Sequence, residues 1–192
     1  MSEAKAKRNR VAPLIATALL VVVSVVANST EDAPGFWATP TIQGYGRMHY
    51  LPDAAYKPQA GGTYKVVLAL SQGVKSPTEV NGALEHVARL VNLYAASGVP
   101  LSHMKFVAIT YGSATPLVLN DAQYRAAFGV ANPNLPLIEK LRAAGVDVAV
   151  CGQAVAEHHY QYDWVDKSVT LALSALTTIT TLEEQGYGLV QM

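Results

Sequence analysis

From residue 64 onward the chain alternates short apolar runs with segments whose apolar residues recur at helical spacing. The runs are rich in Val, Leu, Ile and Ala, which is typical of strands that are buried on both faces. They lie at residues 65–70, 106–110, 146–150, 169–173 and 187–190. This alternation predicts an α/β domain in which a mostly parallel sheet of about five strands carries helices on both faces.

Capping residues and glycines set the expected helix boundaries. Ser76 and Glu79 have the spacing of a capping box, and Pro77 fits the first turn, so the first helix is expected to begin there and to run toward Gly98. Further helices are expected over residues 120–129, 134–145, 154–160 and 174–185.

The first 27 residues have the form of an export signal. A cationic cluster at residues 5–10 precedes an uncharged apolar run at residues 11–27, which ends in Val25, Val26 and Ala27. These short side chains favour cleavage after Ala27 and predict a periplasmic protein. The alternative is an uncleaved anchor in the inner membrane that faces the periplasm, because the run is close to the ~20 residues that span a bilayer.

Residues 28–63 are expected to form an irregular extension ahead of an α/β domain at residues 64–192. They show neither a helical period nor strand alternation, and Pro and Gly interrupt them repeatedly. Their aromatic side chains are expected to pack on the domain or on a neighbouring subunit; the alternative is an aromatic lid over a site. These residues are Phe36, Trp37, Tyr45, Tyr50 and Tyr56.

Composition excludes several classes of protein. The single cysteine, Cys151, cannot close an intramolecular disulfide. Without residues 1–27 the chain keeps 10 basic and 13 acidic side chains, and it has no basic stripe, so a nucleic-acid partner is not expected. The sequence has no GxGxxG, P-loop, HExxH, CxxC or GxSxG motif, and no cofactor is expected.

Candidate site residues follow the first three predicted strands. Ligands of an open parallel sheet sit beyond the carboxyl ends of its strands, where several loops converge. Cys151 is the sharpest candidate, because a thiol between a strand and a helix faces unpaired N–H groups that stabilise a thiolate. The alternative is a small, buried, apolar cysteine. The other candidates for a pocket are Gln72, Tyr111, Gly112, Ser113, Gly152 and Gln153.

His158, His159 and Glu157 raise the question of a metal site near Cys151. Adjacent helical residues point about 100° apart, and two turns, about 10 Å, separate Cys151 from His158. One ion could not readily take all of these ligands, so no metal is expected. His158 stays a candidate proton donor near the thiol.

Three stretches resemble the DsrE/DsrF-like (YchN-fold) sulfur-relay family, in its exported branch. Similarity extends over residues 64–192 and is carried by residues 64–70, 144–153 and 174–187. The resemblance implies a five-stranded fold, trimers or hexamers, and a cysteine at the position of Cys151 that carries sulfur as a persulfide. Many relatives have a histidine where this chain has Tyr111, which leaves an acid–base role there without its usual residue.

Two main hypotheses follow. In the first, the chain is a periplasmic sulfur carrier or sulfurtransferase-like protein whose Cys151 exchanges sulfur with a donor or acceptor protein or a small sulfane compound. Gly152 and Gln153 would supply N–H groups, and Tyr111 or His158 would donate protons. In the second, the chain is a non-enzymatic oligomeric binding or scaffold protein with a buried Cys151. A weaker third hypothesis is redox sensing through a sulfenic acid at Cys151.

Overall fold

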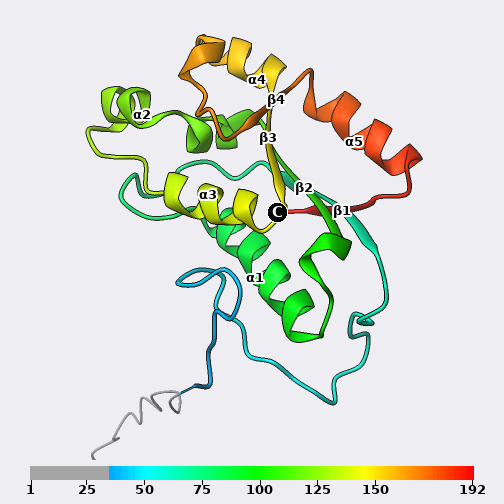
Figure 1. The fold of residues 1–192 in the computed structure, drawn as a ribbon. Helices are drawn as coiled ribbons and strands as arrows, with labels where there is room; N and C mark the ends of the chain where they lie inside the picture. The colour runs from blue at the N-terminus through cyan, green and yellow to red at the C-terminus, as the bar shows by residue number, and fades with distance from the viewer. Residues whose placement is uncertain (1–34) are drawn as a thin grey trace, which may run out of the picture. The chain divides into compact units, whose positions relative to one another are not determined.

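A computed structural model describes residues 35–192. The predicted signal segment lies outside the described residues. The domain is built on one five-stranded sheet with the order β4-β3-β2-β1-β5, in which all pairs are parallel (Figure 1). The strands are β1 (Tyr64–Leu70), β2 (Met104–Thr110), β3 (Asp147–Cys151), β4 (Thr170–Ala172) and β5 (Gly188–Gln191). The predicted fold class is confirmed.

Five α-helices and three short 3-10 helices connect the strands within residues 35–192. The α-helices are α1 (Gly82–Ala96), α2 (Asp121–Phe128), α3 (Leu135–Ala143), α4 (Gly152–Glu157) and α5 (Ala175–Glu184). The 3-10 helices are η1 (Leu101–His103), η2 (Gly112–Val118) and η3 (Tyr162–Trp164). The predicted stop of α2 at Gly129 is confirmed, because that residue adopts the left-handed conformation, with φ of 77°, at the helix end.

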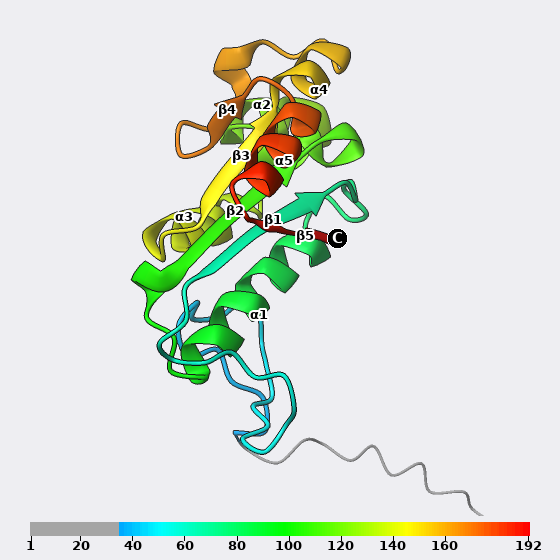
Figure 2. The ribbon, with the colours of Figure 1, turned by 90° about the vertical axis from the view of Figure 1, so that its right-hand side faces the viewer.

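Helices cover the two faces of the sheet unequally. Alternate strand residues such as Leu68, Phe106 and Val148 pack against α1 and α3 in the larger apolar cluster. Their neighbours Val67 and Ile109 belong to a smaller cluster on the other face, which α5 covers. Figure 1 shows α1 and α3 on one side of the strands and α5 on the other, and Figure 2 shows α5 in front of the sheet.

The start of α1 differs from the prediction. The helix begins at Gly82 rather than at the Ser76 capping box, and its N-cap is Asn81. The Asn81 side chain accepts a hydrogen bond from Ala83 N at 2.8 Å, and the Asn81 backbone N–H donates to Asn134 Oδ1 at 2.8 Å. This second bond crosses to the loop before α3, so a tertiary contact decides which cap is used.

The extension lies along α1 of its own chain. Ile42 is 2% exposed and belongs to the larger cluster. Asn92 of α1 accepts hydrogen bonds from Thr41 N and Ile42 N, and it donates to the carbonyl oxygens of Tyr45 and Gly46. Apart from the isolated bridge between Ala38 and Met48, no strand forms in residues 35–63.

Both edges of the sheet expose apolar side chains. Leu173 and Leu176, between β4 and the first turn of α5, are 73% and 79% exposed. On the described part of the chain, no helix is both long and apolar enough to cross a bilayer. Leu171 is also exposed at the β4 edge, and Leu189 and Val190 are exposed at the opposite edge, which β5 forms.

Candidate functional site

Cys151 lies at the junction of β3 and α4. It is the last residue of the strand and the N-cap of the helix, and its Sγ accepts a hydrogen bond from Ala154 N at 3.4 Å. The side chain belongs to the smaller apolar cluster and is 6% exposed. A backbone N–H therefore points at the sulfur, while apolar neighbours bury most of the Cys151 side chain.

Gly152 and Gln153 lie against the end of β4 and the residue that follows it. A Cβ atom on Gly152 would lie 2.8 Å from the carbonyl oxygen of Ala172, which is closer than real Cβ contacts. The Gln153 Nε2 donates to the carbonyl oxygen of Leu173 at 3.2 Å. The N–H that donates to the sulfur is that of Ala154, in place of the expected N–H groups of Gly152 and Gln153, and the Gln153 side chain makes a structural contact.

The loop after β2 lies beside the same junction. Tyr111 packs against the smaller cluster that contains Cys151. His158, at the end of α4, contacts the carbonyl oxygen of Gly112 through its Nε2 at 2.8 Å. Gly112 has a φ of 54°, which a glycine adopts without strain. The fold therefore packs Tyr111 against the cluster of Cys151 and joins Gly112 to His158 at the other end of α4.

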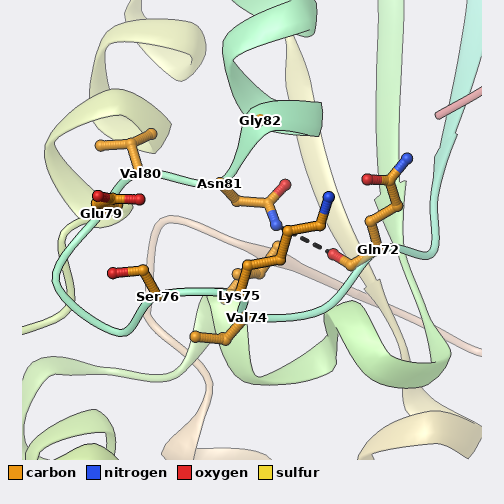
Figure 3. A pocket seen from close by; sticks show the side chains of 9 residues that line it. Gln72, Val74, Lys75, Ser76, Glu79, Val80, Asn81 and Gly82 are labelled. Atoms are coloured by element: carbon orange, nitrogen blue, oxygen red, sulfur yellow. Dashed lines mark hydrogen bonds between the residues drawn. The ribbon is translucent and has the colours of Figure 1, made fainter.

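Ser113 and Gln72 do not belong to the cluster around Cys151. The Ser113 hydroxyl donates to the carbonyl oxygen of Ser71 at 2.6 Å, so it links the loops after β1 and β2. Gln72 lies on the α1 side of the sheet, where it lines a cavity of about 250 Å³ beneath the β1–α1 loop (Figure 3). The rest of the lining comes from Val74, Lys75, Ser76, Glu79, Val80, Asn81, Gly82 and Leu117.

Sequence reasoning missed this cavity because it placed residues 76–81 in a helix. A network of buried amides holds the loop open. Asn81 Nδ2 donates to the carbonyl oxygens of Gln72 and Gly73, and Asn134 binds Asn132, whose Nδ2 donates to Leu117 O at 3.0 Å. The signal in the sequence was the recurrence of asparagine in the loops, at positions 81, 132 and 134.

The histidines and acids around α4 do not form a metal site. Throughout residues 35–192, no three His, Cys, Asp or Glu side chains come together in a way that could hold an ion. The His158 ring instead stacks on Tyr160, with ring centroids 5.3 Å apart, and Tyr160 contacts Trp164. Burial raises the pKa of Tyr160 above its ordinary value.

Two solved structures are similar to this chain. The chain is similar to a solved protein of unknown function, MTH1491 of Methanobacterium thermoautotrophicum, at 16% identity and a TM-score of 0.50, over 67% of this chain and 99% of that one. It is also similar to BT1422 of Bacteroides thetaiotaomicron, a conserved protein of unknown function, at 14% identity and a TM-score of 0.39, over 66% and 94% of the two chains.

The likeness to MTH1491 concerns the fold alone, and a comparison with curated proteins finds no match. The sequence profile of the DsrE/DsrF-like family matches residues 72–192, which include Cys151 and every other candidate residue of the site. This match extends over more than half of the chain. The chain therefore belongs to the DsrE/DsrF-like family.

Proposed function

We propose that the chain is an exported sulfur carrier in which Cys151 holds sulfur as a persulfide. The observation that carries the proposal is the position of the Cys151 Sγ, at the carboxyl end of a central strand with the Ala154 N–H directed at it. A backbone N–H that donates to Sγ stabilises the thiolate, which is the form that attacks a sulfur donor. Membership of a family that is associated with sulfur relay supports this chemistry.

The proposed loading step is a thiol exchange without net oxidation. The Cys151 thiolate attacks the outer sulfur of a donor persulfide, which is a protein or a small sulfane compound. A new S–S bond forms at Cys151, the S–S bond of the donor breaks, and the donor thiolate leaves with the electron pair. Unloading is the same step in reverse with an acceptor thiol.

We propose that His158 and Tyr111 exchange protons with the reacting thiols during this step. Because His158 Nε2 faces a carbonyl oxygen, that nitrogen carries the hydrogen, and the neutral ring has its lone pair on Nδ1. The Nε2 hydrogen is therefore held by Gly112, and Nδ1 is the ring nitrogen that we propose for proton exchange. Tyr111 adds a phenol in contact with the cluster around Cys151.

A second candidate function is a non-enzymatic binding or scaffold protein. The 6% exposure of Cys151 favours it, because the hypothesis expects a buried cysteine. The cavity that Gln72 lines also lies on the other face of the sheet from Cys151. In this case the cavity holds a small ligand and the thiol serves only packing.

Intact mass spectrometry separates the two functions. The folded protein is incubated with a sulfane donor and then weighed with and without a reductant, and Cys151→Ser is the control. The carrier function predicts a gain of one sulfur atom that the reductant removes and that Cys151→Ser lacks. An unmodified thiol that reacts with an alkylating reagent only after unfolding would support the scaffold function instead. The same spectrum shows whether the exported chain begins at Asn28.

A further inference from the structure

Another cavity lies between the extension and the second half of α1. Its volume is about 300 Å³, at the lower end of the range for small-molecule sites. Leu90, Leu93 and Tyr94 line it from α1, and the extension lines it with residues 49–51 and 54–58. We refer to this space as the extension cavity.

Tyr94 gives the extension cavity an ordered aromatic wall. Its ring meets the rings of Tyr64 and Phe106 edge to face, with centroids 4.8 and 5.2 Å away. Both partners belong to the sheet, since Tyr64 is the first residue of β1 and Phe106 lies in β2. An aromatic ligand in the cavity would therefore meet a ring that the core already holds in place.

The opposite wall is a loop that its own hydrogen bonds close. The Ala54 N–H donates to the carbonyl oxygen of Leu51 at 3.2 Å. The Lys57 ammonium donates to the carbonyl oxygen of Pro52 and so joins the two ends of the loop. The backbone of this wall is thus shaped before any ligand binds.

Tyr56, in this loop, combines a strained backbone with an exposed ring. Its φ is 57°, in the left-handed region that a bulky side chain rarely adopts. The side chain is fully exposed, although the residue lines the cavity. Packing within the protein therefore does not compensate for the strain or cover the ring. Strained residues of this kind cluster at ligand clamps.

The charge of the extension cavity favours an anion. Lys57 and His49 line it, and none of its lining residues is acidic. The Lys57 ammonium donates one hydrogen to Pro52 and keeps two for other acceptors. Among residues 35–192 the ion pairs are those of Arg125 and Arg142, so no carboxylate is paired with Lys57.

We propose that the extension cavity binds a small aromatic acid, a planar ring that carries one carboxylate. The ring of the ligand packs against Tyr94 and the two leucines of α1, and its carboxylate accepts hydrogen bonds from Lys57. The exposed ring of Tyr56 turns over the opening and covers the ligand.

The extension cavity and Cys151 lie at opposite ends of the sheet. Tyr94 packs on the first residue of β1, whereas Cys151 is the last residue of β3, and the strands run parallel. Figures 1 and 2 show the extension at the bottom of the domain and α4, which follows Cys151, at the top. Binding in the cavity is therefore independent of sulfur chemistry, and Cys151→Ser should bind the same ligand equally well.

Titration calorimetry on the folded full chain with benzoate, 2-naphthoate and indole-3-acetate tests the proposal. At least one of these acids should bind. The neutral alcohol with the same ring should bind about tenfold more weakly, because a hydrogen bond to a charged group is lost. Lys57→Gln keeps a donor for Pro52; it should weaken the acid by a similar factor and leave the alcohol unchanged, which also shows that the variant is folded.

Two substitutions of Tyr56 test its role as a cover. Tyr56→Phe keeps the ring and should keep the affinity, whereas Tyr56→Ala should lower it about threefold or more. Tyr162→Ala, at an exposed tyrosine in η3, is the matched control and should leave binding unchanged.

Three results would overturn the proposal. The first is that none of the acids binds at millimolar concentration. The second is equal affinity for the acid and its alcohol, because the cavity would then not select an anion. The third is binding that both Lys57→Gln and Tyr56→Ala leave unchanged, because the acid would then occupy another site.

Discussion

At the scale of single residues, Gly152 controls the geometry of the candidate site. A methyl group at this position meets the carbonyl oxygen of Ala172 at 2.8 Å, and this atom belongs to the backbone and cannot turn aside. We expect Gly152→Ala to lower the free energy of unfolding by about 1–3 kcal/mol, the usual cost of overpacking, and to slow sulfur loading of Cys151. Gly188→Ala is the matched control, because a Cβ there has no neighbour within 4 Å. Equal denaturation midpoints of the two variants would contradict this prediction.

Asp121, also at the residue scale, gives the fold a pH dependence at the acid end. The backbone N–H of Asn132 donates to its carboxylate at 2.9 Å, and this bond, together with Arg125, lowers the pKa of Asp121 below the ordinary 3.8. A lowered folded-state pKa stabilises the fold above the unfolded value, and this contribution is lost as the pH falls through the folded value. The stability difference between the unsubstituted chain and Asp121→Asn should therefore shrink below about pH 3.8. Denaturant unfolding at several pH values measures this difference in stability. A difference that stays constant with pH would contradict the prediction.

At the scale of elements, one side chain of α1 holds the extension. Asn92 is fully buried and makes four hydrogen bonds to the backbone of residues 41–46. Asn92→Ala leaves buried backbone groups without partners, so we expect a loss of about 1–3 kcal/mol in stability. Amide exchange at Thr41 and Ile42 should accelerate before that of the sheet.

Arg89→Ala is the control for this element. Arg89 also binds the extension, at the carbonyl oxygen of Arg47, but this contact is exposed. Water replaces such a partner readily, so the stability should change by no more than about 0.5 kcal/mol. If both variants release residues 41–46 to the same extent, Asn92 is not the residue that holds the extension.

The strands and most helix ends could be predicted from the sequence, because they depend on local signals. The apolar run predicts β1 without reference to the rest of the chain, and Gly129 in the same way predicts the end of α2. The start of α1 could not be predicted in this way. The choice between the capping box at Ser76 and the N-cap at Asn81 depends on a hydrogen bond to Asn134, 53 positions further along the chain. The cavity beneath the β1–α1 loop was missed for the same reason.

At the scale of the whole molecule, the exposed leucines around β4 and α5 fit the expected homo-oligomer. Leu173 and Leu176 are the most exposed leucines of this region, and so much apolar surface is usually covered by a partner. We predict that Leu173→Asp and Leu176→Asp reduce a trimer or hexamer to monomers in sedimentation velocity. Leu101→Asp, at an exposed leucine far from this surface in η1, should leave the assembly intact. Monomers of the unsubstituted chain would contradict the prediction.

The candidate site was partly predictable at this scale. Position at the carboxyl edge of the sheet identified Cys151, Tyr111 and Gly112, because parallel strands bring those loops together. Position at this edge did not show that Gln72 lies apart from these three residues. Both faces of the sheet are lined by apolar strand residues, so no local pattern predicts which face a given loop approaches. The loop after β1 turns toward α1, whereas Cys151 belongs to the cluster under α5.

Single-turnover sulfur transfer tests the central claim, that Cys151 takes up and releases sulfur, most directly. The folded protein is loaded from a sulfane donor, separated from it and mixed with an acceptor thiol, and both products are followed by mass. The account predicts that one sulfur atom leaves Cys151 and appears on the acceptor, while Cys151→Ser transfers none. A chain that never gains sulfur while folded, or that transfers it equally well without Cys151, would contradict the account.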